Sequence, residues 1–282
     1  MTDNAPLTVG AAQFAAVGGD VAANVAEHVA LIDAAGRHGV DVLVFPELSV
    51  TGYPAEQMKE GPVESDADSR CRVVDPEGAE LAPIRQACRR SGIVAVVGGA
   101  VRNTRGLGLS AIAIDRQGTV TATYDKQHLD GPEKGWFVLG EAGCMIDVDG
   151  WRLGLGICYD SSFPEHARAL ALAGADAYLV SGAFPLGTSD RRREIYFPAR
   201  ALENTVYLAF SNYVGSHDGF DYGGRSAVYG PDGGVLADAG PSEAGIAVAR
   251  LDPAALGRSR ETTQMLADRR AVAPEVALAV AG

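Results

Sequence analysis

The stretch RLGLGICYDSSFPEHARALALAGADAYLVSG, residues 152–182, alternates between apolar segments and one long alanine- and leucine-rich segment. We predict a buried strand up to residue 157, a helix over residues 163–175 and a second strand over residues 176–182. Strands joined through a helix are typical of parallel strands in a sheet that helices cover. Cys158 stands where the first strand ends. Its position alone is compatible with a buried apolar side chain, a disulfide partner, a metal ligand or a nucleophile.

The same alternation continues on both sides of this stretch. Further strands are predicted at residues 6–14, 40–47, 93–101, 205–212 and 245–252, further helices at 24–39, 78–92 and 190–204, and hairpins at 109–126, 145–158 and 225–240. Neither a linker nor a repeat interrupts this pattern. We therefore expect an α/β fold with mixed parallel and antiparallel strands in a single domain, residues 1–282. From about residue 256 onward we expect a tail that could pack against a second subunit.

Composition and charge exclude several classes of protein. The chain is 47% hydrophobic and 21% charged, which is typical of globular proteins rather than disordered ones. Its net charge of −12 argues against nucleic acid or an anionic membrane as the main partner and weakly favours neutral or cationic substrates. No stretch predicts a signal peptide or a membrane span. We accordingly expect a cytoplasmic, reduced protein.

The four cysteines are scattered, at positions 71, 88, 144 and 158. They form no CxxC pair, and no histidine stands at a spacing typical of zinc ligands. We therefore expect no metal site, and a reducing compartment disfavours structural disulfides.

Three ionisable groups follow apolar strands at distant points of the sequence: Glu47 after VLVFP, Lys126 after VTATYD and Cys158 after RLGLGI. Reactive side chains in α/β proteins often lie just beyond strand ends. Taken one at a time, however, such a glutamate is usually a cap or an ion-pair partner. The lysine could pair with Asp125 at the surface, and the cysteine could simply fill the core.

The local sequences around these groups are more informative than their types. FPELSVTGYP, YDKQHL and GICYDSSFPE occur in this order, and together they resemble the motifs of the nitrilase superfamily of carbon–nitrogen hydrolases. The resemblance extends over nearly the whole chain, from AAQF through ARALENTVYLAFSN to GRSAVYGPDG. It implies a single-domain α-β-β-α sandwich. It also implies a catalytic triad of Glu47, Lys126 and Cys158.

The resemblance further implies how these residues act. Glu47 would be the general base, Cys158 the nucleophile that forms a thioester, and Lys126 a fixed positive charge beside the oxyanion. The backbone N–H of Tyr159 would be a second oxyanion donor, and Glu133 would position the substrate. This chemistry needs neither a metal nor an organic cofactor.

The expected substrate is a small aliphatic primary amide, hydrolysed to a carboxylic acid and ammonia. An N-carbamoyl amine or a nitrile is the alternative for the same triad, and a non-catalytic protein of the same fold is a further one. Tyr53, Trp136, Tyr159, Ala183 and Phe184 are candidate pocket residues. Asp218 and Asp221, in a predicted loop, could bind a substrate ammonium group, although aspartates among glycines are more typical of turn residues.

The remaining motif residues have more ordinary interpretations. Asp160 is expected to be structural, and His128 to orient the lysine loop. His166 could form a papain-like pair with Cys158, but the sequence contexts of such enzymes are missing. Residues 191–193, three consecutive arginines, indicate a solvated helix face or subunit salt bridges rather than an anion site. By analogy with the family, we expect a homodimer or a larger homo-oligomer.

Overall fold

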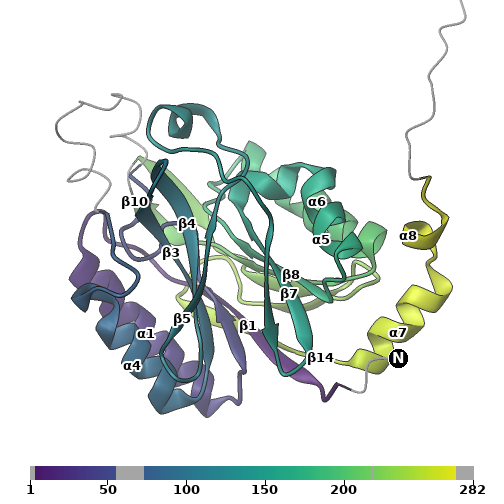
Figure 1. Cartoon of the computed structure of the whole chain (residues 1–282). Coiled ribbons are helices and arrows are strands. Elements are labelled where there is room, and N and C mark those ends of the chain that lie inside the picture. Colours follow the sequence, from purple (N-terminus) through teal and green to yellow (C-terminus); the bar gives the residue numbers. More distant parts are fainter. Residues whose placement is uncertain (1–3, 55–72, 218, 271–282) are drawn as a thin grey trace, which may run out of the picture.

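The elements of the chain stack in four layers (Figure 1). Helices α1 (Val21–Arg37) and α4 (Ala82–Ser91) cover the outer face of one six-stranded sheet. Helices α5 (Pro164–Leu172) and α6 (Thr188–Asn204) cover the outer face of a second six-stranded sheet. This confirms the expected α/β fold with helices outside two mixed sheets. The computed structural model describes residues 4–54, 73–217 and 219–270.

The first sheet combines a parallel centre with antiparallel edges. Strands β1, β2 and β3 are parallel, whereas β14 is antiparallel to β1, and β4 is antiparallel to both β3 and β5. The strands of this sheet are, in spatial order, β14 (Gly245–Leu251), β1 (Leu7–Gln13), β2 (Val42–Val44), β3 (Val94–Asn103), β4 (Gly106–Ile114) and β5 (Val120–Asp125).

The second sheet repeats this design. Strands β7, β8 and β9 are parallel, and β6 and β12 are antiparallel to their inner neighbours. The strands are, in spatial order, β13 (Val235–Asp238), β12 (Ala227–Tyr229), β9 (Tyr207–Ser211), β8 (Ala177–Ser181), β7 (Trp151–Ile157) and β6 (Cys144–Val148).

Apolar side chains fill all three spaces between the layers. One cluster joins the two sheets, a second joins the first sheet to α1 and α4, and a third joins the second sheet to α5 and α6. Because the central strands are covered on both sides, they are apolar throughout, as in LGLGI and YLVS. The sandwich thereby brings the carboxyl ends of strands from both sheets together: Glu47 N, beyond β2, donates to the Gly182 carbonyl, beyond β8.

Three parts of the chain differ from the sequence-based prediction. The predicted helix over 78–92 begins as a short 3-10 turn, η1 (Ala79–Leu81), before α4. Strand β7 ends at Ile157, as predicted, but Cys158 then begins a 3-10 helix, η3 (Cys158–Ser162), that was not predicted. The predicted loop around residues 215–224 is a hairpin of β10 (Val214–His217) and β11 (Phe220–Gly223).

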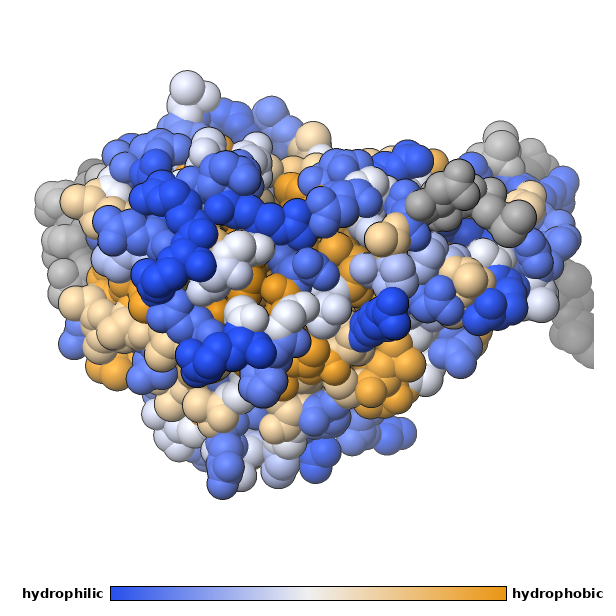
Figure 2. Space-filling view, turned by 90° about the horizontal axis from the view of Figure 1, so that it is seen from below, coloured by the Kyte–Doolittle hydropathy of each residue, from blue (hydrophilic) through white to orange (hydrophobic). Residues whose placement is uncertain are grey.

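The C-terminal part of the described chain forms α7 (Pro253–Thr262) and the short helix α8 (Met265–Asp268). The last part of the predicted tail, residues 271–282, lies outside the described residues. Figure 2 shows apolar residues gathered in the middle of one face, with polar residues around them. Large exposed apolar side chains include Val235 and Leu236 on the edge strand β13. Assembly into a homodimer or a larger oligomer stays a prediction.

Candidate active site

Cys158 lies on a sharp turn between strand β7 and the helices that follow. Its φ of 42° is in the left-handed region, which a non-glycine residue adopts only where its surroundings enforce it. Asp160 accepts a hydrogen bond from Ile157 N at 3.0 Å, and Ser161 Oγ donates to the Cys158 carbonyl at 2.6 Å. These bonds hold the turn so that the thiol is partly exposed and faces the Ala183 carbonyl at 3.9 Å.

Glu47 follows β2 through a turn that depends on a close contact with β3. Leu48, the next residue, has a φ of 51°. A Cβ at Gly98 would lie 2.4 Å from Leu48 N and 2.6 Å from the Pro46 carbonyl oxygen, so only glycine fits beneath this turn. Tyr213 donates its hydroxyl to the Glu47 carbonyl from the other side. The side chain of Glu47 is consequently fixed and buried.

Lys126, immediately after β5, places its ammonium group between two carboxylates. Nζ lies 2.6 Å from Glu47 Oε1 and 2.9 and 2.8 Å from Oε1 and Oε2 of Glu133. All three side chains are almost completely buried. The structure thus brings together two groups that are 79 residues apart in sequence, as the motif resemblance implied.

Glu133 is held from three directions. It lies in the 3-10 helix η2 (Gly131–Gly135), and its Oε2 accepts from Asp130 N at 2.8 Å. Tyr53 donates its hydroxyl to Oε1 at 2.6 Å. Trp136 N donates to the Glu133 carbonyl and closes the turn. Glu133 is therefore a fixed counter-charge of Lys126 and not a solvated loop acid.

The electrostatics of this cluster follow from burying two acids with one base. Burial raises the pKa of Glu47 to about 8. The positive charge of Lys126 opposes this shift, and the charge of Glu133 adds to it. Burial alone would lower the pKa of Lys126, but Glu47 and Glu133 outweigh it and raise the pKa well above its ordinary value. Burial and the negative charge of Glu47 raise the pKa of the Cys158 thiol. The resting site therefore holds a neutral thiol beside a carboxyl that readily exchanges a proton near neutral pH.

Cys158 and Glu47 interact directly in this cluster. A hydrogen bond with the thiol is one of the influences on the pKa of Glu47. Among the described residues, the buried Glu47 Oε2 has no other hydrogen-bond partner. This oxygen is thus available to accept the thiol proton once the thiol turns toward it.

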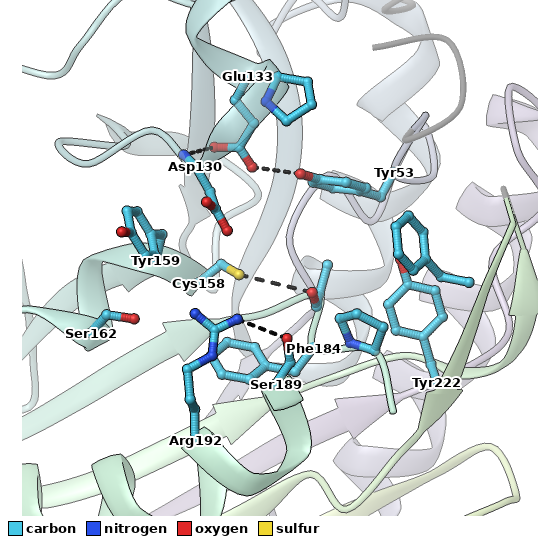
Figure 3. Close-up of a pocket in the computed structure, with 14 residues that line it drawn as sticks. Tyr53, Asp130, Glu133, Cys158, Tyr159, Ser162, Phe184, Ser189, Arg192 and Tyr222 are labelled. Carbon is cyan, nitrogen blue, oxygen red and sulfur yellow. Dashed lines mark hydrogen bonds between the residues drawn. The ribbon is translucent and has the colours of Figure 1, made fainter. Parts of the chain in front are cut away.

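The thiol opens into a cavity of about 260 Å³ (Figure 3). Four of the predicted pocket residues line it: Tyr53, Tyr159, Ala183 and Phe184. The prediction for Trp136 was wrong, since its ring is buried in the core between the sheets and does not line the cavity. The further lining residues are Asp130, Pro132, Glu133, Ser162, Pro185, Ser189, Arg192, Phe220 and Tyr222.

Several of these residues were not predicted from the sequence. Ser189 and Arg192 stand three positions apart, which puts them on one face of α6. Phe220 and Tyr222 alternate with Asp221 on β11, so Asp221 points away from the cavity and is exposed. Asp221 bonds to the Ser216 hydroxyl instead. Asp221 therefore does not line the cavity, where it would have to lie to bind a substrate ammonium, and Asp218 lies outside the described residues.

The arginine cluster divides into three different environments. Arg191 is exposed and pairs with Glu194, as expected for a solvated helix face. Arg193 is buried and pairs with Asp190. Arg192 instead lines the cavity and donates to Ser189 Oγ at 2.8 Å. The interpretation of the whole cluster as a solvated face was thus wrong for Arg192 and Arg193.

Asp160 connects the cysteine turn to the strand that positions Lys126. Its Oδ2 accepts from the Tyr124 hydroxyl at 2.7 Å, and its Oδ1 accepts from the backbone and the ring of His128. Burial would raise the pKa of Asp160, but these bonds and the nearby His166 outweigh it and lower the pKa. The two ring nitrogens of His166 bond to Tyr124 and Tyr178 rather than to Cys158. This geometry gives no support to a papain-like pair.

The part of the chain that the structure describes contains no group of three or more histidine, cysteine or acidic side chains placed to bind a metal ion. None of its helices is long and apolar enough to cross a bilayer.

The chain is similar to known proteins over most of its length. Residues 8–261 match the family described as carbon-nitrogen hydrolase. A Pseudomonas protegens protein called "Hydrolase in pqqF 5'region" is 36% identical over 82% of this chain and 78% of its own length. The 2-oxoglutaramate amidase of Bacillus subtilis is 29% identical over 93% of this chain and 97% of its own.

The chain is also similar to a solved structure, in fold as well as in sequence. The amidase of Nesterenkonia sp. AN1, in complex with acrylamide, superposes with a TM-score of 0.79 at 30% identity, covering 96% of this chain and 97% of that one. Another structure of that amidase holds the acetamide moiety of fluoroacetamide covalently on its active-site cysteine.

Proposed function

The chain belongs to the carbon–nitrogen hydrolase family and is an amide hydrolase, and we propose that it cleaves small aliphatic primary amides through a thioester on Cys158. The observation that supports this most directly is the buried cluster beside the thiol. Lys126 lies there between Glu47 and Glu133, next to a cavity of about 260 Å³ that suits a short linear molecule.

The first step forms the thioester. Glu47 accepts the proton of the thiol, and the Cys158 sulfur attacks the amide carbon, whose oxygen becomes an oxyanion. Lys126 Nζ and the backbone N–H of Tyr159 stabilise that charge. Glu47 then returns the proton to the nitrogen, the carbon–nitrogen bond breaks, and ammonia leaves.

The second step is hydrolysis of the thioester. Glu47 takes a proton from a water molecule that attacks the thioester carbon, and the proton passes to the departing sulfur. The products are a carboxylic acid and the free thiol. Because Glu133 is held by Tyr53 and Asp130 N, it keeps its place beside Lys126 throughout and contributes position and charge, not proton transfer.

A substrate panel tests the proposal. Purified protein is incubated with butyramide, N-carbamoyl-propylamine and butyronitrile, and ammonia release is measured for each. We expect the amide to be hydrolysed fastest. Carbamoyl cleavage would be recognised by the additional release of carbon dioxide, and a preference for that compound would contradict the proposed substrate class.

The thioester intermediate is tested by measuring the mass of the protein after reaction with substrate. Intact-mass spectrometry after rapid quenching is expected to find an acyl adduct on the wild-type protein. Cys158→Ala should form no adduct and release no ammonia. Cys88→Ala, which alters a buried cysteine outside the cavity, should form the adduct and release ammonia as the wild type does. Turnover by Cys158→Ala would exclude the mechanism.

A further inference from the structure

Arg192 brings to the cavity a positive charge that no acid among the described residues pairs with. It lies on the first turns of α6, and its neighbours Arg191 and Arg193 are both paired with acids. Among the described residues, Arg192 itself forms no ion pair. Its one hydrogen bond is donated to the neutral hydroxyl of Ser189, at 2.8 Å.

The guanidinium is therefore poorly satisfied by the protein. An arginine side chain has five N–H donors, and Nε of Arg192 is buried with no hydrogen-bond partner among the described residues. Buried donors without partners are uncommon and call for an explanation. Figure 3 shows the side chain extending from α6 into the cavity, on the side of Cys158 away from Glu133 and Tyr53. A ligand that occupies the cavity would displace the water that solvates this group.

Neutral donors lie beside this charge. Ser189 Oγ accepts from Arg192, so its own hydroxyl hydrogen is free to point to a ligand, and Ser162 lines the same cavity. A carboxylate, which only accepts hydrogen bonds, matches a guanidinium that lies beside the Ser189 hydroxyl, and its planar pair of oxygens fits the guanidinium fork.

The other charges around the cavity do not compete for this role. Glu133 is neutralised by Lys126. Asp130 is exposed and lies at the end of the cavity where Glu133 and Tyr53 are found, whereas Arg192 comes from α6 at the opposite side (Figure 3). The cavity thus has an acid and a base on different sides, and the base contacts the Ser189 hydroxyl.

We propose that Arg192, together with Ser189 and Ser162, binds a carboxylate at the end of the substrate opposite the amide. The preferred substrates are then monoamides of short dicarboxylic acids. This inference rests on the proposed amidase function and narrows it, because it replaces a neutral or cationic substrate by an anionic one. It also assigns Arg192 as the residue that determines specificity.

Three five-carbon amides of nearly equal length test the inference: pentanamide, the monoamide of glutaric acid, and 5-aminopentanamide. They carry no charge, a carboxylate and an ammonium group at the far end, respectively. In the wild type we expect kcat/KM for the glutaric monoamide to exceed that for pentanamide at least about tenfold. Equal values, or a preference for 5-aminopentanamide, would overturn the proposal.

Variants on α6 identify the residue responsible. Arg192→Gln should lose the preference for the glutaric monoamide, so that its kcat/KM values for the glutaric monoamide and for pentanamide become equal to within about threefold. Arg192→Glu should reverse the preference toward 5-aminopentanamide, a change that loss of folding cannot produce. Arg191→Gln is the matched control, since its side chain is exposed and outside the cavity, and it should behave as wild type.

The results distinguish failure of the carboxylate subsite from failure of the proposed amidase function. Turnover of pentanamide without any advantage of the carboxylate, or an advantage that persists in Arg192→Gln, would exclude the carboxylate subsite and leave the amidase function intact. If none of the three amides is hydrolysed and Cys158 acquires no acyl adduct, the proposed function itself is wrong.

Discussion

The ammonium nitrogen of Lys126 lies 2.6 Å from Oε1 of Glu47, in an environment from which solvent is excluded. Glu133 contacts the same nitrogen from another side at 2.8 Å. With both acids ionised, the cluster would hold a net charge of −1 in the protein interior, which is unfavourable. Protonating Glu47 removes that charge, and this is the physical reason for its raised pKa.

The pH dependence of catalysis follows from this cluster. Glu47 must be ionised to accept the thiol proton, and its pKa is raised to about 8. For the uncharged substrate butyramide, kcat/KM should therefore rise with pH through an apparent pKa near 8, with a slope approaching tenfold per pH unit well below it. Initial rates between pH 5.5 and 9.5 test this. A profile that is flat from pH 6 to 9 would show that Glu47 is not the base.

The same raised pKa makes a prediction for stability. The pKa of Glu47 in the folded protein lies above its ordinary value of 4.5, so the stability contributed by its protonated form is complete below about pH 4.5 and is lost as pH rises through about 8. Glu47→Gln cannot lose a proton. The melting temperature of Glu47→Gln relative to wild type should thus be higher at pH 9 than at pH 5, as measured by calorimetry. A relative melting temperature that is independent of pH would contradict this assignment.

Replacement of Lys126 tests the oxyanion charge. Lys126→Met should lower kcat by on the order of 10²- to 10³-fold, the effect typical of losing one oxyanion donor. Because the substitution leaves two buried acids without a positively charged partner, the double variant Lys126→Met/Glu133→Gln is the better-folded version of the test. Lys134→Met, an exposed lysine on the same loop and outside the cavity, is the control and should be unaffected. Near-normal kcat in the double variant would exclude this role.

Asp160 is predicted to position the nucleophile without reacting. Asp160→Asn keeps the size of the side chain but cannot accept all the bonds from Ile157 N, Tyr124 and His128. We expect kcat to fall by on the order of 100-fold, with KM and the apparent pKa of the pH profile nearly unchanged. Asp221→Asn, on the exposed face of β11, is the matched control. A shifted pH profile would indicate a direct part in proton transfer.

The parts of the fold that could be predicted are those in which the apolar residues follow a single pattern, either that of a strand or that of a helix. Strands such as β7 and β8 are nearly continuous apolar segments, and the helix between them shows only a helical pattern of apolar residues. The hairpin of β10 and β11 was missed because its strands are short and flanked by glycines with positive φ, such as Gly219 and Gly224. Such a sequence is equally typical of a loop.

In the candidate site, too, some residues could be predicted from the sequence and others could not. Glu47, Lys126 and Cys158 could be predicted because each is embedded in a local motif. Arg192 could not, because nothing in three consecutive arginines tells which one faces the cavity; that depends on the rotation of α6 over the second sheet. Trp136 was misplaced for a related reason, since an aromatic residue close to a catalytic loop packs equally well inward.

Gly98 adds a constraint that acts at a distance from the chemistry. It lies within β3, in the centre of the first sheet, and a methyl group there would meet the backbone on both sides of Glu47. An alanine at this position should therefore move the general base without altering any side chain around the substrate. Random mutagenesis for lost activity would identify Gly98 alongside the reactive groups, so sensitivity to substitution in this protein is a poor guide to which residues touch the amide.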